Sequence, residues 1–265
     1  MGCRVVIVAA MLVATAGFAS TPDSAAPVFD TRVALQASQA AIGRSLAPDL
    51  EFTDQFGKRR TLLEFRGRPL IVSPVYTSCF GVCPTTTTWL RQVAETAQAV
   101  LGPGSFRVLT IGFDTENDTP QRMREFAAAR GPFPPDWVFG AADAATIQAL
   151  LTGLGFTYAP TPRGFDHMIQ ASIVDGDGTV FRQVYGQEFK PPQLVDPLKR
   201  LVLGQRARED TLDAMIEGVR LFCTVYDPKS GRYRFDWSIV LSAIIGVLCF
   251  TAVAMFLWRS WRRTS

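Results

Sequence analysis

The sequence predicts an α/β protein in which a mixed β-sheet is flanked by helices. Short runs rich in β-branched and aromatic residues alternate with helical patterns, which indicates strands joined by helices. Two of these runs, residues 69–76 and 106–113, are largely apolar, as expected for central strands buried on both faces. An Asp-Gly-Asp-Gly turn at 175–178 separates two more β-rich runs and predicts a closing hairpin.

The first predicted strands surround a turn. The runs 50–53 and 61–62 flank Gly57 and predict a hairpin. The strand over 69–76 follows, and we expect it to end or bulge at Pro74, because proline donates no hydrogen bond to a sheet.

Helices and strands then alternate to the end of the domain. Thr119 is the expected N-cap of one helix, with Pro120 at its first position. The other predicted elements are helices over 85–101, 144–154 and 191–203 and strands over 106–113, 137–139, 170–174 and 180–185. A strand that feeds a cysteine loop and a helix within such a sheet is thioredoxin-like in outline.

Residues 1–19 have the features of a secretory signal peptide. Arg4 supplies a positive charge, residues 5–16 are apolar, and the small residues Gly17 and Ala19 suit cleavage after residue 19. The alternative is an uncleaved membrane anchor. We expect cleavage and export.

The other end predicts a transmembrane helix. Residues 237–258 contain no charged side chain, and such a run is long enough to cross about 30 Å of hydrocarbon. Trp237 and Trp258 lie at its edges, and three arginines in the tail 259–265 indicate a cytoplasmic side. The alternative is a buried core helix. We expect a single-pass C-terminal anchor in the inner membrane, with the globular domain in the periplasm.

Between these ends we expect a tether over 20–45 with one short helix near 33–42, a globular domain over 46–204, and a membrane-proximal helix and stalk over 205–236. Hydrophobic residues make up 48% of the 265 residues and charged residues 19%, which excludes a disordered chain. The formal charge is +3, but Arg4 and the tail arginines account for this excess. The exported domain therefore has no basic surplus, and nucleic-acid binding is excluded.

Five cysteines divide by their expected location. Cys3 leaves with the signal peptide and Cys249 lies in the apolar C-terminal run. Three remain in the exported part: Cys79, Cys83 and Cys223. An oxidising compartment permits a disulfide, but an odd number leaves one thiol without an intramolecular partner.

Cys79 and Cys83 form the centre of the candidate site. They stand four residues apart, between a predicted buried strand and the start of a helix. The N–H groups and dipole of a helix N-terminus stabilise a thiolate, which is both a nucleophile and a metal ligand. This spacing allows the pair to close as a disulfide or to bind one ion. The alternative is an inert disulfide or two buried thiols.

His167 is the only histidine, and it precedes the strand predicted to begin at residue 170. In a thioredoxin-like sheet that position lies beside the cysteine loop, so we expect His167 to be a ligand. The alternative is an exposed side chain in a loop. Two thiolates and one imidazole suit Cu(I), can hold Cu(II) with a further ligand, and can accept zinc. Asp166 either orients the imidazole or is surface charge, and Met168 either gives a weak thioether contact or packs.

The runs YTSCFGVCPTTT, GFDTENDTPQRMREF and DGDGTVFRQVYG, with the Asp166-His167 pair, closely resemble the SCO/SenC family over residues 46–203. The resemblance implies a thioredoxin-like copper-binding protein that helps to assemble cytochrome c oxidase. It implies that Cys79, Cys83 and His167 bind copper. It also implies that copper or electrons pass to the binuclear copper A centre of oxidase subunit II. Another periplasmic copper chaperone is a further candidate partner.

Some features depart from this resemblance or stay open. Many members of the family have an N-terminal span, whereas we expect a C-terminal one here. Cys223 has two interpretations. It is an accessory thiol that contacts a partner, binds a second metal or links a dimer, or it is a buried or unpaired cysteine in a stalk. Asp114 and Asp118 match an acidic segment of the family, and we expect them to support the site without binding metal, with Asp118 acting in helix capping.

The sequence leaves two functions in competition. The first is a metallochaperone, which needs a reduced cysteine pair. The second is a thiol–disulfide oxidoreductase, in which Cys79 attacks a partner's disulfide and Cys83 resolves the mixed disulfide. A peroxidase needs a reactive cysteine that is activated by neighbouring threonine and arginine side chains. Thr77 could supply the threonine, but no arginine lies near Cys79 in the sequence, so this function is disfavoured.

Overall fold

The computed structural model describes residues 29–79, 81–206, 218, 220–228 and 230–264. The predicted signal peptide lies outside these residues, as does most of the predicted membrane-proximal helix.

A seven-stranded mixed sheet forms the centre of the domain. Its strands are β1 (Glu51–Asp54), β2 (Arg59–Thr61), β3 (Leu70–Val75), β4 (Arg107–Gly112), β5 (Trp137–Ala141), β8 (Gln170–Val174) and β9 (Val180–Tyr185). They lie in the order β2-β1-β5-β4-β3-β8-β9, with β3, β4 and β5 parallel and the other pairs antiparallel. The mixed, thioredoxin-like sheet predicted from the sequence is therefore confirmed.

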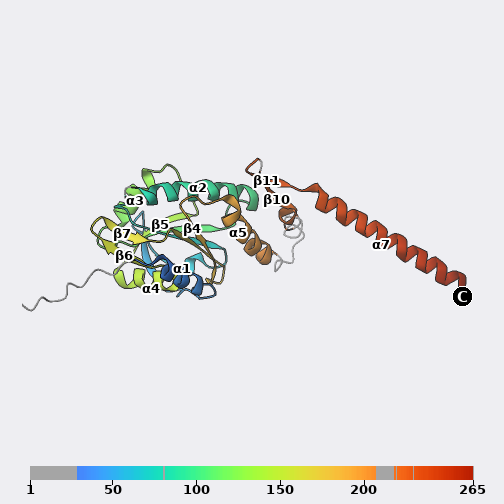
Figure 1. The fold of residues 1–265 in the computed structure, drawn as a ribbon, viewed down its shortest axis with the longest axis horizontal. Coiled ribbons are helices and arrows are strands. Elements are labelled where there is room, and N and C mark those ends of the chain that lie inside the picture. Colours follow the sequence, from blue (N-terminus) through green and yellow to red (C-terminus); the bar gives the residue numbers. More distant parts are fainter. Residues whose placement is uncertain (1–28, 80, 207–217, 219, 229, 265) are drawn as a thin grey trace, which may run out of the picture.

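Helices cover both faces of this sheet. They are α1 (Thr31–Ala40), α2 (Val82–Leu101), α3 (Pro120–Ala128), α4 (Ala144–Leu154) and α5 (Pro191–Arg206), with a short 3-10 helix, η1 (Leu62–Phe65). α2 packs against α5, and α1 and α4 lie together on the opposite side of the sheet (Figure 1). The predicted start of α3 is confirmed, since the hydroxyl of Thr119 accepts the N–H of Arg122 at 3.2 Å.

The short helix expected in the tether is α1, and it belongs to the packed domain. Its Ser38 is fully buried, and the Ser38 and Tyr185 hydroxyls lie 2.9 Å apart. The side chain of Gln183 also donates to the carbonyl of Ser38 at 3.3 Å. The packed part of the chain therefore begins before residue 46.

β3 does not end at Pro74, as we had expected, but continues to Val75. On one side β3 pairs with β4 along its whole length, and on the other side it pairs with β8 only from Leu70 to Val72. Pro74 lies beyond the β8 pairing, so its missing N–H costs no hydrogen bond to that strand. The strand thus carries the chain directly to the cysteine loop.

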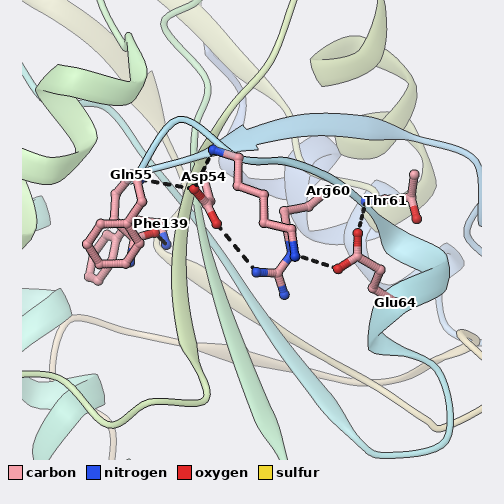
Figure 2. A network of polar contacts seen from close by, with 8 residues as sticks. Asp54, Gln55, Arg60, Thr61, Glu64 and Phe139 are labelled. Atoms are coloured by element: carbon pink, nitrogen blue, oxygen red, sulfur yellow. Dashed lines mark hydrogen bonds and ion pairs between the residues drawn. The ribbon is translucent and has the colours of Figure 1, made fainter.

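The edge hairpin of β1 and β2 is held by a polar network (Figure 2). Arg60 lies between Asp54 and Glu64, with nitrogen–oxygen distances of 3.4 and 2.7 Å. The side-chain oxygen of Gln55 accepts the N–H of Phe139 at 2.9 Å. The Arg60 contacts join the hairpin to η1, and the Gln55 contact joins it to β5.

A second hairpin, β6 (Tyr158–Thr161) and β7 (Gly164–His167), stands apart from the main sheet. The sequence pattern predicts no strand over these residues, and Pro160 and Pro162 are typical of a turn. The aromatic side chains of Tyr158 and Phe165 pack on each other and on Phe113, which makes this segment an ordered two-stranded unit. His167 therefore lies on a strand.

The C-terminal region forms a third hairpin, β10 (Thr224–Asp227) and β11 (Arg232–Phe235), followed by α7 (Trp237–Thr264), which leads away from the domain (Figure 1). Among the described residues, none of the helices combines the length and apolar character needed to cross a membrane. The predicted C-terminal transmembrane helix is therefore wrong. That prediction rested on the length of an uncharged run, the tryptophans at its edges and the arginines after it.

Candidate functional site

The cysteine motif lies where β3 passes into α2. The helix begins at Val82, three residues earlier than predicted, which places Cys83 in its first turn. The N-cap residue is Gly81, which has no side chain to accept a first-turn N–H. The sulfur of Cys79 takes this role instead and accepts the N–H of Cys83 at 3.4 Å.

The two thiols differ strongly in acidity. Burial alone would raise the pKa of Cys79. Hydrogen bonds to its sulfur outweigh this effect of burial and lower the pKa of Cys79. They come from the N–H groups of Cys83 and Gly81 and from the side chains of Cys83 and Tyr76. Cys83 is only 3% exposed, and burial raises its pKa to about 12. The site therefore holds one thiolate-prone sulfur, at Cys79, and one sulfur that keeps its proton.

Tyr76 connects the cysteine loop to the β6–β7 hairpin. Its hydroxyl donates to Cys79, and burial together with this bond raises the pKa of Tyr76 to about 12. The N–H of Phe165 donates to the same oxygen. Tyr76 also packs closely over Gly164, where an added Cβ would lie 3.0 Å from the tyrosine oxygen. Gly164 has a φ of 123°, which favours glycine.

His167 is half-buried among aromatic rings. Its ring centroid lies 5.9 Å from that of Tyr76 and 5.5 Å from those of Phe113 and Phe156. Burial lowers the pKa of His167, so the imidazole is neutral at pH 7. Its Nδ1 lies 3.2 Å from the carbonyl oxygen of Met168, which is the geometry of a donor Nδ1–H. Nε2 is then left with its lone pair, the form that binds a metal.

The structure brings Cys83 and His167 to the same small cavity, of about 10 Å³, beneath the cysteine loop. Ile169 and Gln170, at the start of β8, line it as well. Within the described residues, however, no three side chains of histidine, cysteine, aspartate or glutamate gather closely enough to hold a metal ion. The three expected ligands thus share one end of the sheet without forming a closed coordination site.

Asp118 supports the site, as the family resemblance implies, but through contacts other than helix capping. We had explained it as helix capping, but Thr119 is the cap, and Asp118 turns inward to the cysteine loop. Its carboxylate accepts the N–H and hydroxyl of Thr77 and the N–H of Asp114. Asp114 in turn lies 3.5 Å from the hydroxyl of Ser78. Both acidic residues therefore position the loop, as expected for supporting residues.

Two other expectations concern residues around the histidine and the third thiol. Asp166 is exposed on β7, and the backbone carbonyl of Met168 accepts from the imidazole in its place. Cys223 is 3% exposed, which agrees with the reading of a buried cysteine. Cys79, Cys83, Cys223 and Cys249, the cysteines of the described residues, are free thiols.

Sequence reasoning missed Arg130. It follows α3 and lies more than forty residues beyond the cysteines in sequence. The fold brings it close to them: burial lowers the pKa of Arg130, and negative charge on Cys83 and Cys79 partly offsets this effect. Its guanidinium carbon lies 3.3 Å from the ring centroid of Phe126. No local pattern marked this arginine, because its approach to the site depends on how α3 packs on the sheet.

Comparison with known proteins identifies the family of this chain. The SCO1/SenC family model matches residues 38–203. The SCO1 protein homolog of Bacillus subtilis is 26% identical over 145 residues, which are 53% of this chain and 74% of that protein. The mitochondrial SCO2 homolog of Bos taurus is 26% identical over 168 residues, which are 61% of this chain and 60% of the bovine protein.

Solved structures show the same fold. A putative electron transfer protein from Aquifex aeolicus is 26% identical, with a TM-score of 0.57 over 62% of this chain and 95% of that one. Yeast Sco1, solved with copper bound, is 17% identical, with a TM-score of 0.51 over 63% of this chain and 96% of that one. Because the family model covers well over half of the sequence, the chain belongs to the SCO1/SenC family.

Proposed function

We propose that this protein binds one copper ion through Cys79, Cys83 and His167, and that it takes part in the assembly of cytochrome c oxidase. Copper is here the cargo, passed to the binuclear copper A centre of oxidase subunit II. We further propose that the domain works in the periplasm, as the signal-like residues 1–19 favour. Copper-bound yeast Sco1 and the SCO homologues among its relatives support this proposal.

One observation carries the proposal: Cys83 and His167 line the same cavity, and the sulfur of Cys79 contacts the N–H of Cys83. The donor set fits copper, because two sulfurs and one neutral imidazole are the soft ligands that Cu(I) prefers. Cys79 is already prone to be a thiolate, whereas Cys83 must lose its proton when the ion binds. Loading therefore releases a proton from the buried sulfur.

His167 completes the donor set from a separate hairpin. Since the described residues hold no ready-formed metal group, loading requires the cysteine loop and the β6–β7 hairpin to approach each other. Tyr76 already joins these two units, through its bond to Cys79 and its contact with the backbone of Phe165. We propose that this tyrosine keeps the histidine strand within reach of the sulfurs.

The test is copper stoichiometry and affinity on the reduced protein. We expect about one tightly bound copper per chain in the parent and much weaker binding in His167→Ala. Met168→Leu is the matched control, because it alters the neighbouring side chain but leaves the carbonyl that holds the imidazole. Unchanged copper affinity in His167→Ala would contradict the assignment of this ligand.

The unequal acidity of the two thiols favours a second candidate, a thiol–disulfide oxidoreductase that keeps the copper-site cysteines of a partner reduced. Cys79 would attack and Cys83 would resolve the mixed disulfide. In that case His167→Ala retains full reductase activity toward a disulfide-bonded partner peptide. Loss of both copper binding and reductase activity in Cys79→Ser alone does not separate the two functions, so the histidine variant is the informative one.

A further inference from the structure

An open groove of about 660 Å³ lies between the first turns of α2 and the residues that follow α3. One wall is formed by the first turns of α2, with Pro84, Thr85 and Trp89 among its residues. The other wall includes Arg130, which follows α3. Pro84 directly follows Cys83, and Arg130 on the other wall lies close enough to interact electrostatically with a thiolate at Cys83 or Cys79, although neither cysteine lines the groove. Trp89, which is 37% exposed, adds an apolar surface to the groove.

Arg130 is held from inside the protein and faces this groove. One of its terminal nitrogens donates to the carbonyl of Phe126, and its guanidinium carbon lies over the Phe126 ring, 3.3 Å from the ring centroid, in a cation–π contact. Its Nε is buried and has no hydrogen-bond partner. Among the described residues, no carboxylate pairs with this guanidinium. The position of the positive charge is therefore fixed, while its ion-pairing capacity is unused.

We propose that Arg130 is a specificity-determining residue, and that the groove receives a partner segment in which a carboxylate lies close to the reacting cysteine. The carboxylate pairs with Arg130 while the partner's sulfur meets Cys79. This inference rests on the proposed function, because both versions of that function require a partner that presents sulfur to the cysteine pair. A charged partner group bound to a fixed guanidinium gives specificity and a faster encounter.

Small disulfides of different charge test the inference without knowledge of the partner. The thiolate of Cys79 attacks one sulfur of the reagent, which forms a mixed disulfide and releases one aryl thiolate. Cys83 then loses its proton to water and attacks the sulfur of Cys79, which closes the Cys79–Cys83 disulfide and releases the second aryl thiolate. Two electrons pass from the cysteine pair to the reagent, and the released chromophore gives the rate.

The experiment compares the reduced full-length chain with its variants, using dianionic dithiobis(nitrobenzoate) and neutral dithiodipyridine. We expect Arg130→Gln to slow the dianionic reagent about tenfold and the neutral one less than about twofold. Arg130→Lys should retain most of the preference, and added salt should reduce it. The background from other thiols, which include the exposed Cys249, is subtracted with a Cys79→Ser, Cys83→Ser double variant.

Arg124→Gln is the matched control. It removes the same charge six residues earlier, within α3, but Arg124 lines a different groove, beside Phe133 and Trp137. The inference is overturned if Arg130→Gln slows both reagents equally, or if Arg124→Gln has the same effect on the dianionic one. Copper affinity is measured separately on the same variants. A protein that prefers anionic disulfides but binds no copper would refute the proposed metal function and leave the role of Arg130 intact.

Discussion

The carboxylate of Asp118 accepts hydrogen bonds from both the backbone N–H and the hydroxyl of Thr77, at 2.8 and 2.6 Å. Thr77 lies two residues before Cys79, so this contact ties the cysteine loop to the segment that follows β4. The carboxylate also accepts the N–H of Asp114 at 2.9 Å. The position of the reactive sulfur thus depends on a residue that is 3% exposed and some forty residues away in sequence.

Replacing this carboxylate should loosen the loop. Asp118→Ala leaves the N–H groups of Thr77 and Asp114 and the Thr77 hydroxyl without their acceptor, and we expect a loss of about 1–3 kcal/mol in the free energy of unfolding. Urea denaturation followed by circular dichroism measures it. Asp166→Ala is the control, because Asp166 is exposed, and it should change stability by less than about 0.5 kcal/mol. Equal effects of the two changes would contradict the anchoring role.

The backbone of β4 makes room for the same side chain. A Cβ added at Gly112 would lie 2.5 Å from the Cβ of Asp118, so one of the two residues must shift. We expect Gly112→Ala to destabilise the protein by about 1–3 kcal/mol. Gly204→Ala, in α5, meets no atom within 4 Å and should be neutral or stabilising by up to about 1 kcal/mol. Thermal unfolding of both variants measures the two effects. A loss of stability in Gly112→Ala alone indicates crowding at Gly112, whereas an equal loss in both variants indicates a general cost of the added methyl group.

The two cysteines should differ in reactivity. With a lowered pKa and partial exposure, Cys79 should be alkylated by iodoacetamide at pH 7 more than about tenfold faster than buried Cys83. Tyr76→Phe removes a hydrogen bond to the Cys79 sulfur and should slow its alkylation about threefold. Tyr158→Phe, in the same aromatic cluster, should leave the rate unchanged. Mass spectrometry of the labelled peptides gives each rate, and equal rates for the two cysteines would contradict the assigned asymmetry.

Stability should fall in mildly acidic solution because of His167. Burial holds the pKa of His167 in the folded protein below the ordinary value of 6.5, so the unfolded chain binds its proton first as the pH falls. This contribution is fully present above pH 6.5 and is lost as the pH falls from there toward the lowered folded pKa. Because His167 is the only histidine, His167→Gln should flatten the pH dependence in this window. Denaturant unfolding at a series of pH values measures it, and an unchanged slope in the variant would refute the explanation.

The sequence identified the sheet, most of its helices and the two cysteines, because each has a local signal. Apolar runs mark β3 and β4, and the pair Thr119-Pro120 marks the start of α3. The sequence did not predict the β6–β7 hairpin, whose prolines suggest a loop. The hairpin is ordered by contacts with Phe113, and Phe113 is more than forty residues away in sequence.

The candidate site was predicted in part for the same reason. Cys79, Cys83 and His167 are conspicuous by residue type and position, and the predictions about their roles still await measurement. The roles of Tyr76, Asp118 and Arg130 follow only from tertiary contacts, since each acts on residues from another segment of the chain. The C-terminal helix shows the opposite error, because a long uncharged run with flanking tryptophans and arginines predicted a membrane span that no helix of the described residues provides.

The hydrogen bond from the N–H of Cys83 to the sulfur of Cys79 makes this amide sensitive to the chemical state of that sulfur. When that sulfur gives an electron pair to a metal or joins a disulfide, it becomes a weaker acceptor for this amide. The Cys83 amide proton should then shift in an NMR spectrum and exchange faster with deuterated solvent. A single backbone resonance would thus distinguish free, oxidised and loaded protein without any label.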